Sequence, residues 1–500
     1  MRYAIAIAIT LSIFMTSALA TEFKVSGVYT AWGQSQHDFW FGKKGKANED
    51  YNDNYVVQML RFKVVGAVND NLRFVTRLDI AQGWWGIDNA LRSVQRTQTA
   101  GGSSLFDFKD TNFLVHVDQA YVEFTVPNTP LDVRVGRMWY GLGNRIMVDN
   151  NYDGVQFDLK DVVGKKLTFS WAKVSEGVDA LSDERVVKPD ARGYTDARDA
   201  HMFILNLNNA TGSLNYDVYG MYYWDASIAD GNAYVPDHLQ FFKTRFSPQI
   251  SNLMAIGLAG TFKKDKLTIK GELDYLSGKD KIKNTTYGLK QKWDINNGDL
   301  SGYNIYLKTT YAATDKVSVG AVFGMGSGDD DLTGGKGNVN KLRTSGFFYI
   351  TEVWEDSIMP DEEGITPQGL GAPNVRGYRE LENTTILQLN TTIKPVPKLS
   401  CFFSYNYLKA TQPIPKWVYK ERKEGDKIIV EKNEIDYSET ATDLGQEVDF
   451  KISYKMYKEL DLTLRGGVFM PGDAAAFLIN GTNKFKKNAW ELKATITYKF

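Results

Sequence analysis

The last eleven residues, Trp490-Glu-Leu-Lys-Ala-Thr-Ile-Thr-Tyr-Lys-Phe500, decide the fold. Every even-numbered position in this stretch is apolar, and every odd-numbered position is charged or Thr. Such strict alternation predicts a β-strand with one apolar face and one polar face. Eleven residues is also the length of a tilted strand that crosses a bilayer.

The same alternation recurs upstream, and no stretch after residue 20 shows a helical period over three turns. A looser example lies at Leu72–Ile80. The clear examples are Leu267–Tyr275, Tyr303–Tyr311, Val448–Met456 and Leu460–Arg465.

Short turns and long polar connections alternate between these segments, and both chain ends fall on the short-turn side. Each expected turn is rich in Asn, Asp, Gly, Pro or Lys. The eight short turns lie at 69–71, 127–130, 161–165, 208–212, 263–265, 313–315, 395–397 and 457–459. The nine long connections lie at 34–54, 84–111, 139–151, 175–200, 225–248, 277–301, 326–382, 410–444 and 470–487. Together they join 18 strands.

This pattern predicts an all-β protein, a transmembrane antiparallel β-barrel of 18 strands with short periplasmic turns and long extracellular loops. A sheet in lipid must leave no unpaired backbone edge, so it closes into a cylinder. Sixteen strands is the alternative if the hairpin at 201–224 does not form. A soluble propeller would need a second sheet to bury the apolar faces.

The N-terminus has the three parts of a secretory signal. Arg2 supplies the positive charge, Ala4–Phe14 is the apolar region, and Ala18-Leu-Ala20 is the cleavage site. We therefore expect a signal peptide at 1–20, cleavage near Ala20/Thr21, and export to the outer membrane. Residues 21–500 then form one barrel domain with a long loop at 326–382.

Composition excludes several other functions. The 59 basic and 60 acidic residues nearly cancel, which argues against a nucleic-acid partner. The single Cys excludes a disulfide framework, and the four His residues have no metal-ligand spacing. Since no Ser–His pairing stands out either, we expect no enzyme activity and no resident cofactor.

The polar strand faces must meet water, and about 16–18 strands leave an aqueous channel. Segment 326–382 is long enough to plug it. If several cations share one side of the lumen, the channel prefers anions. The alternative is that they pair with Asp79, Asp118, Glu123, Asp132 and Asp158 and only hydrate the wall. The expected pore-lining cations are Arg61, Lys63, Arg73, Arg77, Arg134, Arg137 and Arg145.

Two segments resemble a known family. Val133–Arg145, continuing to Asn150–Val155, is similar to the "G-R-x-x-x-x-G-x-x-R … N-x-x-x-D-G-V" stretch of alginate-export-type outer-membrane porins. Gly324–Asp331 is similar to that family's "S-G-D-D". The resemblance implies an 18-stranded monomeric porin that passes anionic polysaccharide or other small acidic solutes. The matching positions are Gly136, Arg137, Arg145, Asp153 and Gly154.

Two further features carry separate predictions. The loop Gly326–Asn338 resembles part of a calcium-binding β-roll, which makes Asp329, Asp330 and Asp331 candidate Ca²⁺ ligands, with an acidic loop tip as the alternative. Phe500 resembles the C-terminal signature that the barrel-assembly machinery recognises. The partners of the protein would then be that machinery and outer-membrane lipid.

The sequence thus favours an outer-membrane porin, a water-filled channel for small hydrophilic solutes, with uronate-like or oligosaccharide-like anions among the candidates. A surface adhesin or structural protein is the alternative, and an outer-membrane hydrolase is a second one. The transported solute, the ion selectivity, the oligomeric state and plugging by a loop stay open at this level.

Overall fold

The structure is a computed structural model. It describes residues 22–44, 52–85, 116–162, 164–175, 200–225, 250–280, 299–328, 337–338, 348–358, 381, 383–424 and 427–500. The expected signal peptide and the candidate calcium ligands Asp329–Asp331 lie outside these residues.

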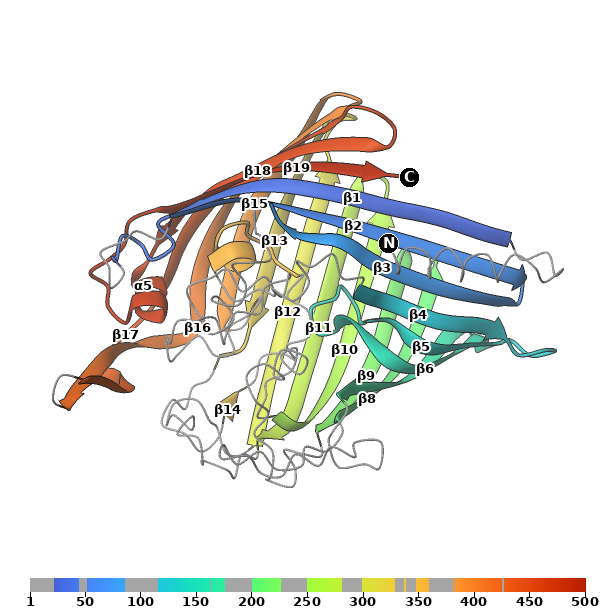
Figure 1. The fold of residues 1–500 in the computed structure, drawn as a ribbon, viewed down its shortest axis with the longest axis horizontal. Coiled ribbons are helices and arrows are strands. Elements are labelled where there is room, and N and C mark those ends of the chain that lie inside the picture. The colour runs from blue at the N-terminus through green and yellow to red at the C-terminus, as the bar shows by residue number, and fades with distance from the viewer. Residues whose placement is uncertain are drawn as a thin grey trace, which may run out of the picture.

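Eighteen antiparallel strands follow one another around a closed barrel, as the alternation predicts (Figure 1). Each strand pairs with the next in the chain, and β13 pairs with β15. The strands are β1 (Glu22–His37), β2 (Asn52–Asn69), β3 (Leu72–Trp84), β4 (His116–Thr125), β5 (Leu131–Gly141), β6 (Asp149–Val162), β7 (Lys165–Ser175), β8 (Ala200–Thr211), β9 (Leu214–Asp225), β10 (Ile250–Lys264), β11 (Leu267–Asp280), β12 (Asp299–Ala312), β13 (Val317–Gly326), β15 (Thr384–Val396), β16 (Leu399–Glu424), β17 (Lys427–Lys455), β18 (Leu460–Pro471) and β19 (Ala489–Lys499).

The first and last strands close the barrel. β1 pairs with β19 from Val28↔Lys499 to His37↔Trp490. The backbone of Gly27 also bonds that of Phe500 in both directions, at 2.9 and 3.1 Å. Closure leaves no free edge in the ring, which is what a sheet in lipid requires.

The two rims differ as the sequence predicts. Each of the eight expected short turns lies at or beside a hairpin turn on one rim, and the longer connections lie on the other. The turn expected at 208–212 falls at 212–213, because β8 continues to Thr211. The hairpin of β8 and β9 is paired along its whole length, from Ala200↔Asp225 to Thr211↔Leu214. The barrel therefore has 18 strands, and the 16-strand alternative is wrong.

One predicted loop is a hairpin instead. The stretch 410–444 was expected to be a polar loop, but β16 and β17 continue through it with only 425–426 between them. Their paired segments include Trp417–Tyr419 and Ile428–Val430, which are apolar residue types that favour strands. The many charged residues around them made the whole stretch resemble a polar loop. Figure 1 shows the hairpin of β16 and β17 projecting beyond the other strands.

Three smaller elements lie in the connections of the loop rim. β14 (Gly337–Asn338) pairs in parallel with β12, η4 (Trp354–Ile358) is a π-helical turn, and α5 (Asp473–Asn480) is a short helix. Among the described residues, no helix is long and apolar enough to cross a membrane.

Alternation sorts the side chains onto two faces of the barrel. On β19 the outward positions Trp490, Leu492 and Ile496 are exposed, while inward Glu491 and Lys493 are 2% and 5% exposed. Two apolar clusters are buried inside the ring. One packs on β5–β11, and the other packs on β12–β19 together with η4 and α5.

Candidate functional site: the lumen wall

Five of the seven predicted pore-lining cations point into the lumen. Arg61 and Lys63 of β2 lie opposite Asp79 and Arg77 of β3, and all four alternate with outward apolar residues. The other inward cations are Arg73 of β3 and Arg134 of β5, which lie opposite Glu123 of β4.

A first group of ion pairs joins β2, β3 and β4. The Arg61 guanidinium donates to both carboxylate oxygens of Asp79, at 2.7 and 2.9 Å, and lies 4.0 Å from Asp118. Arg77 donates to the same Asp118. The register shifts opposite Arg77 and Leu78, so consecutive Asp118 and Gln119 are both buried on the inner side. The irregular alternation of this segment predicts such a bulge.

A second group joins β3 to β7. Glu123 accepts from Arg73 at 2.6 Å and from Arg134 at 3.0 Å. Asp158 lies 3.4 Å from Arg134 and 3.2 Å from Lys166. Lys160 pairs with Asp132 at 2.5 Å. We call both groups together the ion-pair network.

Within the ion-pair network, the cations are more exposed to the water of the lumen than the carboxylates are. In every one of its pairs the cation is more exposed than the carboxylate: Arg73 is 50% exposed against 13% for Glu123, and Lys166 is 43% exposed against 3% for Asp158. Pairing therefore occurs, as the alternative interpretation of the sequence expects. It nevertheless leaves the positive partners at the surface of the wall.

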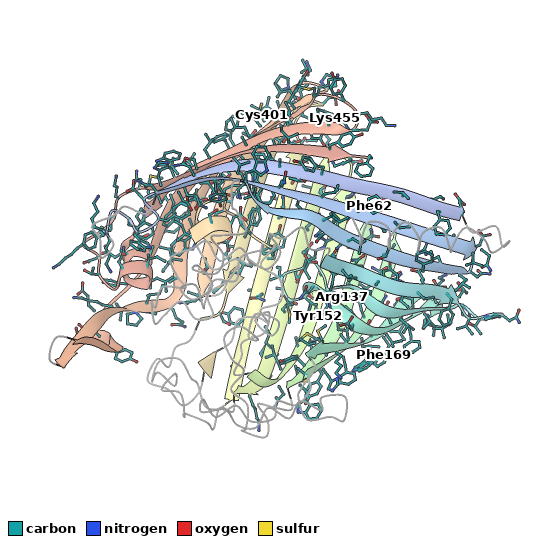
Figure 2. The ribbon with its side chains drawn as sticks, in the orientation of Figure 1. Phe62, Arg137, Tyr152, Phe169, Cys401 and Lys455 are labelled. Carbon is teal, nitrogen blue, oxygen red and sulfur yellow. The ribbon has the colours of Figure 1, made fainter. Side chains whose placement is uncertain are left out.

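The prediction that Arg137 and Arg145 line the pore is wrong. Arg137, labelled in Figure 2, shares the outward face of β5 with Val135 and Trp139, which are 45% and 41% exposed. It lies three residues from inward Arg134, and an odd spacing in a regular strand means opposite faces. Arg145 lies in the β5–β6 connection, with its guanidinium over the Trp139 ring at 5.0 Å.

The β5–β6 connection, residues 142–148, folds inward and reaches the opposite part of the wall. The Asn144 side chain donates to the Gly271 carbonyl at 3.1 Å, and its backbone N–H donates to the Glu272 carboxylate of β11. At Gly143, which has φ +51°, a Cβ would lie 2.5 Å from that carboxylate. Only Gly combines this backbone conformation with so close an approach.

The apolar residues of 142–148 fix the connection in place. Leu142 and Met147 pack in the cluster on β5–β11, whereas Ile146 packs in the cluster on β12–β19. The connection therefore bridges the two clusters and narrows the lumen beside the ion-pair network.

Segment 348–358, part of the predicted long loop, packs against the inner wall at β17–β19. The fully buried Glu447 carboxylate of β17 accepts the backbone N–H groups of Val353 and Trp354, at 2.6 and 2.9 Å. Ser357 donates to Glu491 of β19, and the Trp354 ring stacks on Phe469 at 4.8 Å. Inward carboxylates of the strands thus bind backbone and hydroxyl donors of the segment.

An ion-pair cluster holds the same segment to β18. Arg465 lies 2.8 Å from Glu352 and 3.2 Å from Asp356, and it donates to the Tyr349 hydroxyl at 2.5 Å. Lys493 of β19 lies 3.4 Å from Asp356. Burial raises the pKa of Glu352 to about 7; Arg465 opposes this shift and Asp356 adds to it.

The helix α5 completes the cover at this side. Its residues Ala474–Ile479 are buried in the cluster on β12–β19. Asn480 at its end donates to the Trp40 carbonyl at 3.0 Å and accepts from Lys43 at 3.3 Å. We call β11–β19 with 142–148, 348–358 and α5 the covered wall. Sequence reasoning missed these inward folds, although the apolar runs Ile146–Val148 and Ala474–Ile479 in otherwise polar connections were a signal.

Two of the motif glycines have a packing role. Gly136 and Gly154 lie opposite each other on the inward faces of β5 and β6. A Cβ on Gly136 would lie 2.3 Å from the Ala120 carbonyl, and one on Gly154 would lie 2.4 Å from the Tyr140 hydroxyl. The motif therefore marks a tightly packed part of the wall.

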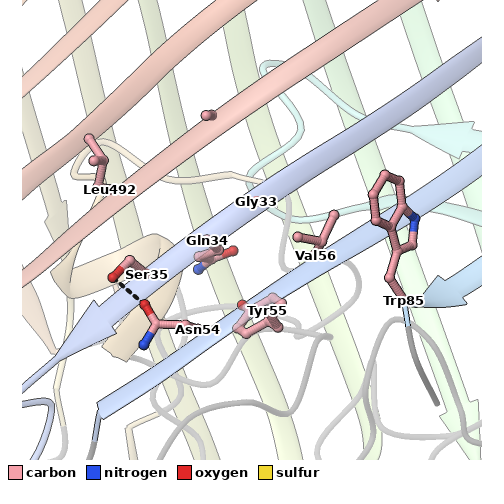
Figure 3. Close-up of a pocket in the computed structure, with 9 residues that line it drawn as sticks. Gly33, Gln34, Ser35, Asn54, Tyr55, Val56, Trp85 and Leu492 are labelled. Carbon is pink, nitrogen blue, oxygen red and sulfur yellow. Dashed lines mark hydrogen bonds between the residues drawn. The ribbon is translucent and has the colours of Figure 1, made fainter.

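Two hollows among the described residues lie outside the channel. One of about 500 Å³ lies on the outward face of β1, β2 and β19, between Gly33, Val56 and Leu492 (Figure 3). Ser35 donates to Asn54 there at 2.6 Å. A neighbouring hollow of about 450 Å³ extends to β17 and β18. Both face lipid, so neither is a solute site.

Two of the four histidines, His37 and His201, have described side chains, and both stack on aromatic rings. His37 stacks on Trp490 at 4.1 Å, and His201 stacks between Trp171 and Trp224, each at 6.0 Å. Within the described part of the chain, no group of three His, Cys, Asp or Glu side chains could hold a metal ion.

The fold of this chain is similar to the folds of three solved bacterial proteins, one of which is described as a porin. OccAB1 of Acinetobacter baumannii is 13% identical, with a TM-score of 0.52 over 96% of this chain and 97% of that one. A BenF-like porin of Pseudomonas fluorescens Pf-5 is 10% identical, with a TM-score of 0.49 over 96% and 98%. OccK8 (OprE) of Pseudomonas aeruginosa is 11% identical, with a TM-score of 0.49 over 96% and 98%.

The likeness to OccAB1 shows that the chain has the fold of an outer-membrane porin. The narrower resemblance of the two motifs to alginate-export-type porins stays a prediction. No family model matches the sequence, and no curated protein matches it.

Proposed function

We propose that this protein is a channel in the bacterial outer membrane that passes small hydrophilic solutes. A closed ring of 18 strands is wide enough for an aqueous lumen. The inward strand faces carry the charged side chains that such a lumen hydrates, and the outward faces are largely apolar. The inward segments 142–148 and 348–358 and the helix α5 narrow this lumen.

We further propose that the channel prefers anions. The observation that carries this is the exposure of the ion-pair network, in which each cation is more exposed than its carboxylate. A permeating ion therefore meets guanidinium and ammonium groups first. The motif resemblance adds uronates and acidic oligosaccharides to the solutes worth testing.

Planar-bilayer recordings test both proposals. Discrete ohmic conductance steps are expected, together with a reversal potential of anion-selective sign in a KCl gradient. Liposome swelling should be faster with uronates than with neutral sugars of the same size. An absence of steps would favour the surface adhesin, and cation selectivity would overturn the anion preference alone.

The terminal residue has a place in this proposal. The Phe500 ring is outward, 47% exposed, and lies over Gly27, where a Cβ would come within 2.3 Å of it. We propose that this exposed aromatic end is what the barrel-assembly machinery recognises. Deletion of Phe500 should lower the amount of assembled barrel in outer-membrane fractions, whereas a Thr497→Ser control should not.

A further inference from the structure

Three charged side chains lie on the lipid-facing side of β5–β7. Arg137 of β5, Asp153 of β6 and Lys173 of β7 lie side by side in register, all at outward positions. Arg137 lies 3.6 Å from Asp153, whose side chain is 68% exposed. A lipid-facing Arg or Lys costs about 2–4 kcal/mol at the bilayer midplane but only about 0–1 kcal/mol near an interface.

Aromatic side chains mark this place as an interface. Trp139, Trp171 and Trp224 are outward residues near the loop-rim ends of β5, β7 and β9, where tryptophans of membrane barrels gather. Trp171 donates to His201 at 3.3 Å within the stack of these rings. The charges therefore lie at headgroup depth, where anionic lipid groups are in reach.

A third cation joins them from the connection above. The Arg145 side chain is 60% exposed, and its guanidinium is held over the outward Trp139 ring at 5.0 Å. Asp149 accepts from Trp139 at 2.5 Å and lies 4.0 Å from Arg145. We call Arg137, Arg145 and Lys173 the outer cation patch; among the described residues, Asp153 and Asp149 are the carboxylates that lie next to Arg137 and Arg145.

We propose that the outer cation patch binds the phosphorylated headgroup of an outer-leaflet lipid. Long connections face the outside in bacterial outer-membrane barrels, so the patch lies in the outer leaflet. The planar guanidinium of Arg matches the geometry of phosphate oxygens, and Lys adds a point charge. The tryptophan rings beside it contact the adjoining acyl region.

Binding to vesicles tests the proposal. The purified full-length barrel is titrated with vesicles of zwitterionic phosphatidylcholine, with and without lipid A, an anionic lipid that carries phosphate monoesters. Its thermal unfolding midpoint is followed. Lipid A is expected to raise the midpoint of the parent protein. The double variant Arg137→Gln/Lys173→Gln is expected to bind lipid A about thirtyfold more weakly.

A matched control variant removes two positive charges from the lumen wall instead of the lipid-facing side. Arg73→Gln/Lys166→Gln, which changes two lumen cations, should keep the response to lipid A. The proposal is overturned if the outer double variant responds like the parent. It is also overturned if inorganic phosphate gives the same shift, because the site would then not require a lipid. A shift with phosphatidylcholine alone overturns it too, because the site would then not require a net negative headgroup.

Single-channel conductance separates this proposal from the channel function. The outer double variant should form channels of parental conductance, which also shows that it is folded. Lost lipid response with normal conductance supports the patch, whereas lost lipid response together with lost channels contradicts a role limited to lipid binding.

Discussion

The inner face of β2–β7 and the covered wall use the same kinds of side chain in different ways. On β2–β7 the carboxylates pair with cations that remain exposed to the lumen. On the covered wall, Glu272 and Glu447 instead accept backbone N–H groups of segments folded into the barrel. An inward charge in a barrel therefore lines the channel only where no connection folds over it.

The largest change is expected from removing an anchor of the covered wall. Glu447→Ala leaves the N–H groups of Val353 and Trp354 without their acceptor, at about 1–3 kcal/mol for each buried donor. Segment 348–358 should detach, so single-channel conductance should rise and the segment should become sensitive to protease. Glu22→Gln, an exposed change at the other rim, is the control. Parental conductance and protease resistance in Glu447→Ala would contradict the anchoring role.

Proton binding to Glu352 should change the attachment of segment 348–358 to the covered wall, but by less than Glu447→Ala does. Its pKa of about 7 in the folded segment lies above the ordinary value of 4.5, so the folded segment binds the proton more tightly than a detached one. The attachment of segment 348–358 to the wall is therefore strongest below pH 4.5. Its free energy becomes less favourable by about 3 kcal/mol as the pH rises through 7.

Conductance recorded at pH 5 and pH 8 checks this direction, with fewer opening fluctuations expected at pH 5. Glu352→Gln should remove most of the difference, although it keeps a side chain of the same size beside Arg465 and Asp356. A difference of the opposite sign, or one that survives in Glu352→Gln, would assign the pH response to another group.

The smallest change is expected from the ion-pair network. Arg73→Gln/Lys166→Gln leaves both carboxylates paired, because Arg134 still contacts Glu123 and Asp158. The variant removes two unit charges that lie about 7 Å from a permeating ion and whose field is screened by salt. This loss should lower the anion-to-cation permeability ratio about threefold. Reversal potentials measure this ratio. Arg137→Gln, which removes an outward cation, should leave it unchanged, and equal effects of the two variants would contradict the assignment of faces.

The strands were predictable because their alternation is local. The pattern of 490–500 repeats around the ring, and the eight turns follow from their Asn, Asp, Gly and Pro residues. Even the opposite faces of Arg134 and Arg137 were contained in their odd spacing. The irregularity at Asp118 and Gln119 was likewise visible as a break in alternation.

The covered wall was not predictable from such local patterns. Glu447 and Val353 are 94 residues apart, and Asn144 and Glu272 are 128 apart. The inward path of each connection depends on these distant contacts. No spacing along the chain shows which carboxylate of a strand will meet a backbone N–H from elsewhere. The β16–β17 extension was missed for another reason, since its strand-forming residues are diluted by charge.

The pairing of Gly27 with Phe500 has a consequence for protein engineering. The two ends of the described barrel lie next to each other on the short-turn rim, and eight hairpin turns lie on that same rim. A short linker could therefore join the ends, and new termini could be opened at a turn such as Asn69–Leu72 without removing any strand pair. Each circular permutant would keep the same ring of neighbours and differ only in which strand is synthesised last.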